Sequence, residues 1–252
     1  MVLDAVAVDA CSERDVVDAA VTAASDGRGG WIVTVNVDIL RSLHRDATLR
    51  RLIAPATFVV ADGMPLVWLA RLLRTPLPER VAGASLISSL TQAAAGTLSV
   101  YVLGGPPGVA RSAAKALRRE NPSLHIAGAH GPAMGFERDA REFAAAIAAV
   151  VDATPDIVFC GFGFPKQEEV IARLRRELPH AWFLGCGAAL SFLAGALPRA
   201  PRWMQRAGLE WLHRLLVEPR RLFRRYLVDD VPFVCLLFAR AAATRARSAA
   251  AR

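Results

Sequence analysis

The sequence lacks the short motifs that identify three common classes of enzyme. No Asp-x-Asp pair occurs, so the usual carboxylates for holding a metal ion against a nucleotide diphosphate are missing. Neither G-x-G-x-x-G nor the P-loop pattern is present, and dinucleotide or ATP binding therefore has no motif support. No G-x-S-x-G motif occurs either, which argues against a hydrolase with a serine triad.

Patterns for metal binding, membrane spanning and secretion are missing as well. The four cysteines form no C-x-x-C pair and the five histidines have no ligand spacing, so we expect reduced core cysteines and no metal site. The longest charge-free apolar stretch near the C-terminus, 231–239, has 9 residues, whereas a spanning helix needs about 20. The first residues do not resemble a secretory signal. These absences predict a cytoplasmic protein.

Positive charge is concentrated at the C-terminus. Residues 199–252 hold 12 Arg, no Lys and 4 acidic residues, which accounts for the whole net charge of +8. These arginines alternate with Trp, Leu, Phe and Tyr. A segment that is both cationic and apolar favours an anionic, apolar surface such as lipid phosphates at a membrane face. We therefore expect peripheral association with a membrane.

Apolar runs alternate with helical patterns from residue 31 to about residue 190. This alternation predicts an α/β fold of the Rossmann-like kind, with a mostly parallel sheet and helices on both faces. The expected strands are 31–35, 57–60, 98–103, 124–127, 156–160 and 181–184. The expected helices between them are 39–43, 65–73, 86–95, 109–119, 137–151 and 166–178.

The composition changes at a pair of prolines, Pro198 and Pro201. Prolines at such a point favour a domain boundary. We predict an α/β catalytic domain over 1–198 and a helical, Arg-rich, membrane-associating appendage over 199–252. The Ala/Arg/Ser-rich end after Arg240 is low in complexity, and we expect it to be frayed.

Polar residues follow three of the expected strands. Asn36 follows the first strand, Asp62 follows the second, and Gln167 lies in the segment after the fifth. Ligands bind beyond the carboxyl ends of the strands in open parallel sheets. Asn36 and Asp62, taken singly, could instead cap the helices that follow them. Three polar residues at three strand ends favour a shared site.

A glycine-rich turn, GGPPG at 104–108, joins another expected strand to a helix. Backbone N–H groups at such a turn can cradle a phosphate at a helix N-terminus. A tight turn with no ligand would use the same residues, so the signal is weak by itself.

Six segments of the sequence together resemble a known family of enzymes. They are TVN at 34–36, ADGMP at 61–65, ERVAG at 79–83, LGGPPG at 103–108, GFGFPKQE at 161–168, and RAP at 199–201 with GLEW at 208–211. In these segments and their order, over about residues 30–228, the chain resembles the WecG/TagA/CpsF family of bacterial glycosyltransferases.

The resemblance implies transfer of a sugar from a UDP-sugar to a polyprenyl-diphosphate-linked sugar, with inversion. The reaction would take place at the inner face of the plasma membrane, in cell-envelope or exopolysaccharide biosynthesis. N-acetylmannosamine is slightly favoured as the donor sugar, over a related hexose or uronic acid, because it is an established donor in the family. The resemblance also implies metal-independent chemistry, and we expect no cofactor. A homo-oligomer is left open.

The transfer reaction that the resemblance implies suggests roles for several residues in the matching segments. An acceptor hydroxyl must lose a proton as it attacks the anomeric carbon, and Asp62 is the expected general base. Thr34 and Asn36 would orient the sugars or Asp62. Without a metal, the departing UDP needs N–H or cationic stabilisation, for which the arginine fork is suited. The candidate substrate-binding residues are Gly63, Gly104, Gly105, Gly108, Gly163, Lys166, Gln167, Glu168, Arg214, Arg221 and Arg224.

Two other classes of function are considered. The first is a non-enzymatic module that binds a membrane surface or nucleic acid through its arginines. Such a module would leave the polar residues at the strand ends without a role. The transferase hypothesis, in contrast, expects no nucleic acid partner. The second is a nucleotide-sugar epimerase or another dinucleotide enzyme, which the missing G-x-G-x-x-G motif disfavours.

Overall fold

The computed structural model describes residues 2–4 and 6–250, and its centre is a six-stranded parallel sheet. The strand order is β4-β3-β8-β7-β5-β6. The strands are β3 (Gly30–Val35), β4 (Phe58–Ala61), β5 (Ser99–Gly104), β6 (His125–His130), β7 (Ile157–Gly161) and β8 (Trp182–Gly185). Each lies within two residues of its predicted range at the start and three at the end, and the predicted α/β class is confirmed.

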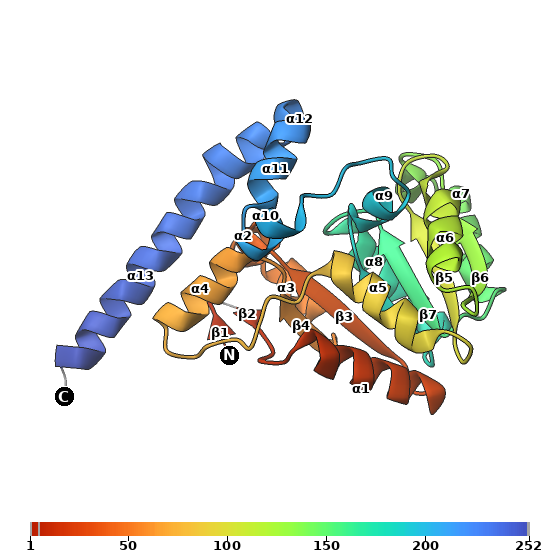
Figure 1. Ribbon diagram of the computed structural model, residues 1–252, viewed down its shortest axis with the longest axis horizontal. Helices are drawn as coiled ribbons and strands as arrows, with labels where there is room; N and C mark the ends of the chain where they lie inside the picture. The colour runs from red at the N-terminus through yellow and green to blue at the C-terminus, as the bar shows by residue number, and fades with distance from the viewer. Residues whose placement is uncertain (1, 5, 251–252) are drawn as a thin grey trace.

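Helices cover both faces of the sheet (Figure 1). They are α1 (Glu13–Ser25), α2 (Val37–Arg45), α3 (Ala47–Ile53), α4 (Met64–Leu72), α5 (Gly83–Ala94), α6 (Val109–Glu120), α7 (Ala140–Val151), α8 (Lys166–Glu177) and α9 (Ala189–Leu193). Two short strands, β1 (Val2–Leu3) and β2 (Val6–Ala7), form a separate antiparallel pair, and η1 (Phe136–Arg138) precedes α7.

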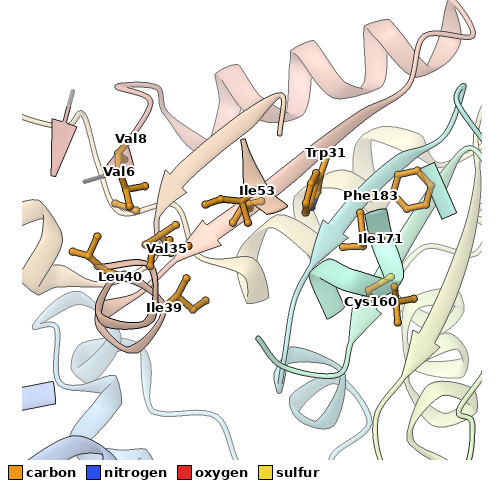
Figure 2. Packing of buried hydrophobic residues seen from close by; sticks show 14 of the residues in the cluster. Val6, Val8, Trp31, Val35, Ile39, Leu40, Ile53, Cys160, Ile171 and Phe183 are labelled. Carbon is orange, nitrogen blue, oxygen red and sulfur yellow. The ribbon is translucent and has the colours of Figure 1, made fainter. Parts of the chain in front are cut away.

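Side chains that alternate in direction along the strands form two hydrophobic clusters, one on each face of the sheet. On β3, Trp31, Val33 and Val35 belong to one cluster, whereas Ile32 belongs to the other. Successive side chains of a strand point to opposite faces, so a strand buried on both sides is apolar throughout. Figure 2 shows part of the first cluster, including Trp31.

Helix α1 was not expected, although a local signal for it exists. Ser12 caps the helix and forms a reciprocal capping box with Asp15. Such a Ser-x-x-Asp/Glu pair before an apolar-periodic segment is typical of a helix start. The helix buries Val16, Val17 and Ala20 against α5 and the sheet.

The C-terminal segment is helical to the end of the described chain. It comprises α10 (Arg202–Arg206), α11 (Glu210–Val217), α12 (Pro219–Phe223), the π-helix η2 (Arg224–Asp230) and α13 (Val231–Ala250). The structure thus has a continuous helix where we expected a frayed end after Arg240. Figure 1 shows α13 lying alongside α4 and extending away from the sheet.

The C-terminal segment packs on the α/β part as well as following it in sequence. Phe233, Leu237 and Ala241 recur every four residues on α13 and are buried in the cluster that contains Leu66 and Leu69 of α4. This four-residue spacing places them on one face of the helix. The boundary between residues 198 and 199 stays a prediction, but the two parts share a core.

Candidate active site

A cavity of about 630 Å³ lies beyond the carboxyl ends of β4, β3, β8 and β7. Its lining includes Thr34, Asn36, Asp62 and Gln167, so the three predicted strand ends do converge. The C-terminal segment, through residues such as Arg214, also contributes to the lining. The predicted crevice is therefore present, and residues remote in sequence complete it.

Asp62 lies between β4 and α4 but does not cap the helix. Its backbone N–H donates to Val35 O (2.7 Å), which continues the parallel pairing with β3 by one residue. The next residue, Gly63, has φ 155°, a value that favours glycine, and α4 starts after it without a side-chain cap. The Asp62 carboxylate instead accepts a hydrogen bond from Gly83 N–H (3.4 Å) at the start of α5. It is thereby left facing the cavity.

The surroundings of Asp62 favour a base that is stronger than an ordinary carboxylate. Burial raises the pKa of Asp62 from 3.8 to about 6, although the nearby Arg80 guanidinium opposes the rise. Glu210 adds to the rise, whereas the Gly83 N–H and Arg214 oppose it. A carboxylate with a pKa near 6 is mostly ionised at neutral pH and accepts a proton more readily than a solvated one.

An ion pair beside Asp62 joins the α/β part to the C-terminal segment. Arg80 Nη1 donates to Glu210 Oε2 (2.9 Å), and both side chains are only 17% exposed. Arg199 lies farther from the same carboxylate, at 3.8 Å. Neither Arg80 nor Glu210 was predicted as a site residue, yet both lie within segments that carry the family resemblance, ERVAG and GLEW.

Thr34 and Asn36 have structural partners at the cavity floor. Thr34 Oγ1 donates to Gly185 O on β8 (3.2 Å), which ties two strand ends together. Asn36 caps α2, because its Oδ1 accepts from Ile39 N (3.0 Å). The capping alternative is therefore correct for Asn36 and wrong for Asp62. Capping uses only the amide oxygen of Asn36, and its predicted role in orienting the sugars or Asp62 stays a prediction.

Gln167 and Glu168 form a buried chain of hydrogen bonds behind the cavity. Gln167 Oε1 accepts from the backbone N–H groups of Gly163 (3.2 Å) and Gly187 (3.0 Å), one in each of two cavity loops. Gln167 Nε2 donates to Glu168 Oε1 (2.9 Å), and Trp31 Nε1 donates to Glu168 Oε2 (3.2 Å). The amide of Gln167 thus holds the loops after β7 and β8, whereas Glu168 is fully buried and does not line the cavity.

Gly185 leaves space for the hydrogen-bonded side chains of Gln167 and Glu168. A Cβ added at Gly185 would lie 2.5 Å from Gln167 Nε2 and 2.7 Å from Glu168 Oε1, so no larger residue fits without displacing the pair. The glycine at the end of β8 is therefore required by close approach of side chains and not by backbone conformation.

Replacing Glu168 with Gln is expected to remove a pH dependence of stability. Burial raises the pKa of Glu168 from 4.5 to about 7, only partly offset by the hydrogen bonds from Gln167 and Trp31. The unfolded chain therefore loses this proton at lower pH than the folded chain, so the free energy of unfolding decreases as pH rises between these values. Between the two pKa values, ionisation of Glu168 lowers the free energy of unfolding by roughly 3 kcal/mol.

Urea denaturation across this pH range measures the effect. The Glu168→Gln variant should lack the decrease, whereas Glu169→Gln, a change at an exposed neighbour, should retain it. An unchanged pH profile in Glu168→Gln would mean that Glu168 ionises normally in the folded protein.

The predicted arginines take different positions. Arg214 and Arg221 line the cavity, but Arg224 does not. The Arg214 guanidinium lies over the Phe192 ring (5.6 Å), and its Nε is buried without a hydrogen-bond partner among the described residues. Arg221 pairs with Glu218 (2.7 Å) and is 56% exposed. Arg214 is therefore the better placed of the two to bind an anion inside the cavity.

Several other predicted residues lie away from the cavity. Gly63 and Gly163 line it, but the turn that contains Gly104, Gly105 and Gly108 does not. The reason is strand order, since β5 follows β7 toward the far edge of the sheet. Lys166 pairs with Glu137 at 2.6 Å and is also absent from the lining. Binding of substrate by these residues stays a prediction.

A charged network borders the same cavity, and it was not predicted from the sequence. Arg41 on α2 donates to Asp230 Oδ1 (2.9 Å) and to Asp38 Oδ1 (2.7 Å). Arg225 Nε lies 3.3 Å from Asp38 Oδ2. Asp38, Arg225 and Asp230 all line the cavity, so the network fastens the π-helix η2 to α2 at its edge.

The described residues contain neither a metal-binding cluster nor a membrane-spanning helix. Within residues 2–4 and 6–250, no group of three His, Cys, Asp or Glu side chains is arranged to hold a metal ion. No helix over the same residues is both long and apolar enough to cross a bilayer. The expectation that the reaction needs no cofactor stays a prediction.

Comparison with known proteins gives a consistent result. The sequence model of the family described as "Glycosyl transferase WecG/TagA/CpsF family" matches residues 1–247. A relative named N-acetylglucosaminyldiphosphoundecaprenol N-acetyl-beta-D-mannosaminyltransferase, from Bacillus spizizenii, is 34% identical over 201 residues, which are 79% of this chain and 76% of the relative.

Proteins of the same name from two other species are also similar. The one from Bacillus subtilis strain 168 is 31% identical, over 77% of this chain and 73% of its own length. The one from Staphylococcus aureus strain NCTC 8325 is 30% identical, over 77% of this chain and 74% of its own length.

Proposed function

The chain belongs to the WecG/TagA/CpsF family of glycosyltransferases, and on this basis we propose that it transfers a sugar from a UDP-sugar to a polyprenyl-diphosphate-linked sugar with inversion. The observation that carries the proposal is Asp62, a carboxylate with a raised pKa that faces a cavity also lined by Arg214. This arrangement provides a base for the acceptor and a cation for the leaving diphosphate in one space.

The reaction is a single displacement at the anomeric carbon. The acceptor oxygen forms a bond to that carbon while the bond to the UDP oxygen breaks, and Asp62 takes the proton of the acceptor hydroxyl. UDP departs with the bonding electron pair, and the added negative charge is stabilised by Arg214 with Arg221 or Arg225 nearby. Base and leaving group lie on opposite sides of the reacting carbon, which yields inversion.

The names of the relatives suggest the sugars. They describe transfer of N-acetylmannosamine to N-acetylglucosaminyl-diphospho-undecaprenol. We propose N-acetylmannosamine as the donor sugar and a diphosphate-linked N-acetylglucosamine as the acceptor. The non-enzymatic alternative and the dinucleotide enzyme have no support from the family.

Membrane association at the inner face of the plasma membrane belongs to the same proposal. The C-terminal segment exposes large apolar residues among its arginines, notably Trp203 (64%), Leu216 (72%) and Phe223 (56%). Apolar side chains flanked by cations suit the interface of an anionic bilayer. Formation of a homo-oligomer stays a prediction from the sequence.

A donor screen tests the proposal. Purified protein is incubated with one UDP-sugar at a time and a short-chain polyprenyl-diphospho-N-acetylglucosamine, and UDP release and product mass are measured. We expect UDP release with UDP-N-acetylmannosamine, matched by a product heavier by one N-acetylhexosamine residue. UDP release without the heavier product, or no release with any donor, would contradict the proposal.

A further inference from the structure

The cavity lining contains apolar residues that the proposed chemistry leaves without a role. Besides polar residues such as Asp62 and Arg214, it includes an apolar set from α4 and α13, namely Met64, Pro65, Trp68, Val231, Val234 and Cys235. Figure 1 shows these two helices side by side. We call the apolar part the α4–α13 cleft.

The cleft side of α13 differs from the side that packs on the core. Phe233 and Leu237 are buried, as described above. Val231, Val234 and Cys235 follow the spacing i, i+3, i+4, which places them together on another face of the helix. These three side chains line the cavity, whereas Phe238, one turn farther along the helix, packs against the core cluster.

The cleft is also open to solvent. Trp68 is 41% exposed and Val231 is 44% exposed, and Cys235 is exposed as well. Contiguous apolar surface in contact with water is unfavourable by roughly 25 cal/mol per Å². Such a surface, continuous with a ligand cavity, is typical of a binding site for an apolar group.

A cationic group lines the same cavity as the cleft. Arg225 lines the cavity from η2, and η2 ends at Asp230, directly before Val231 of the cleft. The cavity that contains Asp62 therefore also offers arginines and an apolar surface. A lipid-linked sugar combines the three matching groups: a sugar hydroxyl, a diphosphate and a hydrocarbon chain.

We propose that the α4–α13 cleft binds the first isoprene units of the acceptor's polyprenyl chain. The inference rests on the proposed function for the identity of the acceptor, and it adds where the hydrocarbon chain leaves the active site. The first units thus contact Trp68 and Val234 of the protein before the chain reaches the bilayer.

Filling the cleft tests this assignment through the acceptor KM. Val234→Trp places a large ring in the cleft, and the matched control Leu236→Trp adds the same ring at a 43% exposed position that does not line the cavity. Two acceptors are compared, N-acetylglucosamine diphosphate linked to farnesol and the same headgroup linked to a hexyl chain.

The expected result is a change in the ratio of the two acceptor KM values. In Val234→Trp, the KM for the farnesyl acceptor should rise by roughly tenfold or more relative to the hexyl acceptor, as expected when about two methylene groups lose their burial. Leu236→Trp should leave the ratio at its wild-type value. An unchanged ratio in Val234→Trp would overturn the proposal.

Alkylation of Cys235 provides a readout that is independent of transfer. Cys235 is exposed in the cleft, whereas Cys160 and Cys186 are buried. The rate of its modification by iodoacetamide is followed by mass spectrometry of the peptide. Farnesyl diphosphate should slow the reaction several-fold, and inorganic diphosphate at the same concentration should not. Equal rates with both ligands, or equal protection by a phospholipid with two acyl chains, would contradict a prenyl-specific cleft.

The two experiments separate this inference from the proposed function. Protection of Cys235 by farnesyl diphosphate in a protein that transfers no sugar would support the cleft and contradict the function. Normal sugar transfer with neither protection nor a change in the KM ratio would support the function and overturn the cleft.

Discussion

Replacing Asp62 with Asn is expected to reduce kcat for sugar transfer by about 10²–10⁴-fold while UDP-sugar binding is retained. The carboxamide keeps the shape of the side chain but cannot accept the acceptor's proton at neutral pH. Initial rates of UDP release give kcat, and calorimetric titration with UDP-sugar gives the dissociation constant. Turnover near the wild-type value would exclude Asp62 as the general base.

The pH profile of the wild-type enzyme provides a second measure of the same role. Because the base must be ionised, and burial raises the pKa of Asp62 to about 6, kcat/KM is expected to fall as the pH drops below this value. Residual activity of Asp62→Asn should lack this dependence. A wild-type profile that stays flat down to the ordinary carboxylate range would show that the base is a different group.

Two controls separate loss of chemistry from loss of structure. Asp229→Asn removes one negative charge near the cavity at a residue that does not line it, and it should leave kcat unchanged. Asp62→Asn itself should be no less stable than wild type above about pH 6, because desolvation opposes the charge that the substitution removes.

Deleting all residues after Pro198 is expected to abolish both sugar transfer and binding to anionic vesicles. The deletion removes the cavity wall that contains Arg214 and the exposed apolar residues of the C-terminal segment. All six strands lie before this point, so an α/β core should still fold. Vesicle co-sedimentation, transfer assays and circular dichroism measure the three outcomes.

The truncated core should be less stable than the full chain. Phe233 and Leu237 leave the cluster that they share with α4, and each large apolar side chain contributes about 1.5–3 kcal/mol when buried. Arg80 also loses its partner Glu210. Thermal unfolding of the two proteins measures the difference.

A shorter deletion is the matched control. A chain that ends at Ala243 keeps every cavity-lining residue and the buried Ala241, and it should retain transfer activity. Full activity of the chain that ends at Pro198 on a lipid-linked acceptor would contradict a role for the C-terminal segment in the reaction.

The strand ends show how far local sequence predicts this site. Asp62 and Asn36 were identified because each follows a short apolar run, and parallel strands present their carboxyl ends at one edge. What the side chains do there was not predictable, since Asn36 caps its helix whereas Asp62 turns to the N–H of Gly83. The choice depends on the turn at Gly63 and on where α5 begins.

The contacts between distant segments could not be predicted. Arg80 and Glu210 are 130 residues apart, and Arg41 and Asp230 are 189 residues apart. No periodicity or spacing connects such pairs, because their proximity results from how α2 and the C-terminal helices pack on the sheet. The position of Glu168 behind Gln167, rather than in the cavity, is likewise a result of the helix face that α8 presents to β8.

The sequence by itself determined the α/β class, the strands, the polar strand ends and the family, because these depend on local patterns of apolar and polar residues. It also determined that the net positive charge lies in the C-terminal segment. Only the tertiary structure decided which arginines line the cavity, that Lys166 and the turn at 104–108 lie outside it, and that an apolar cleft adjoins it. Strand order and helix packing bring those groups together or keep them apart, and both are set by contacts between residues far apart in the chain.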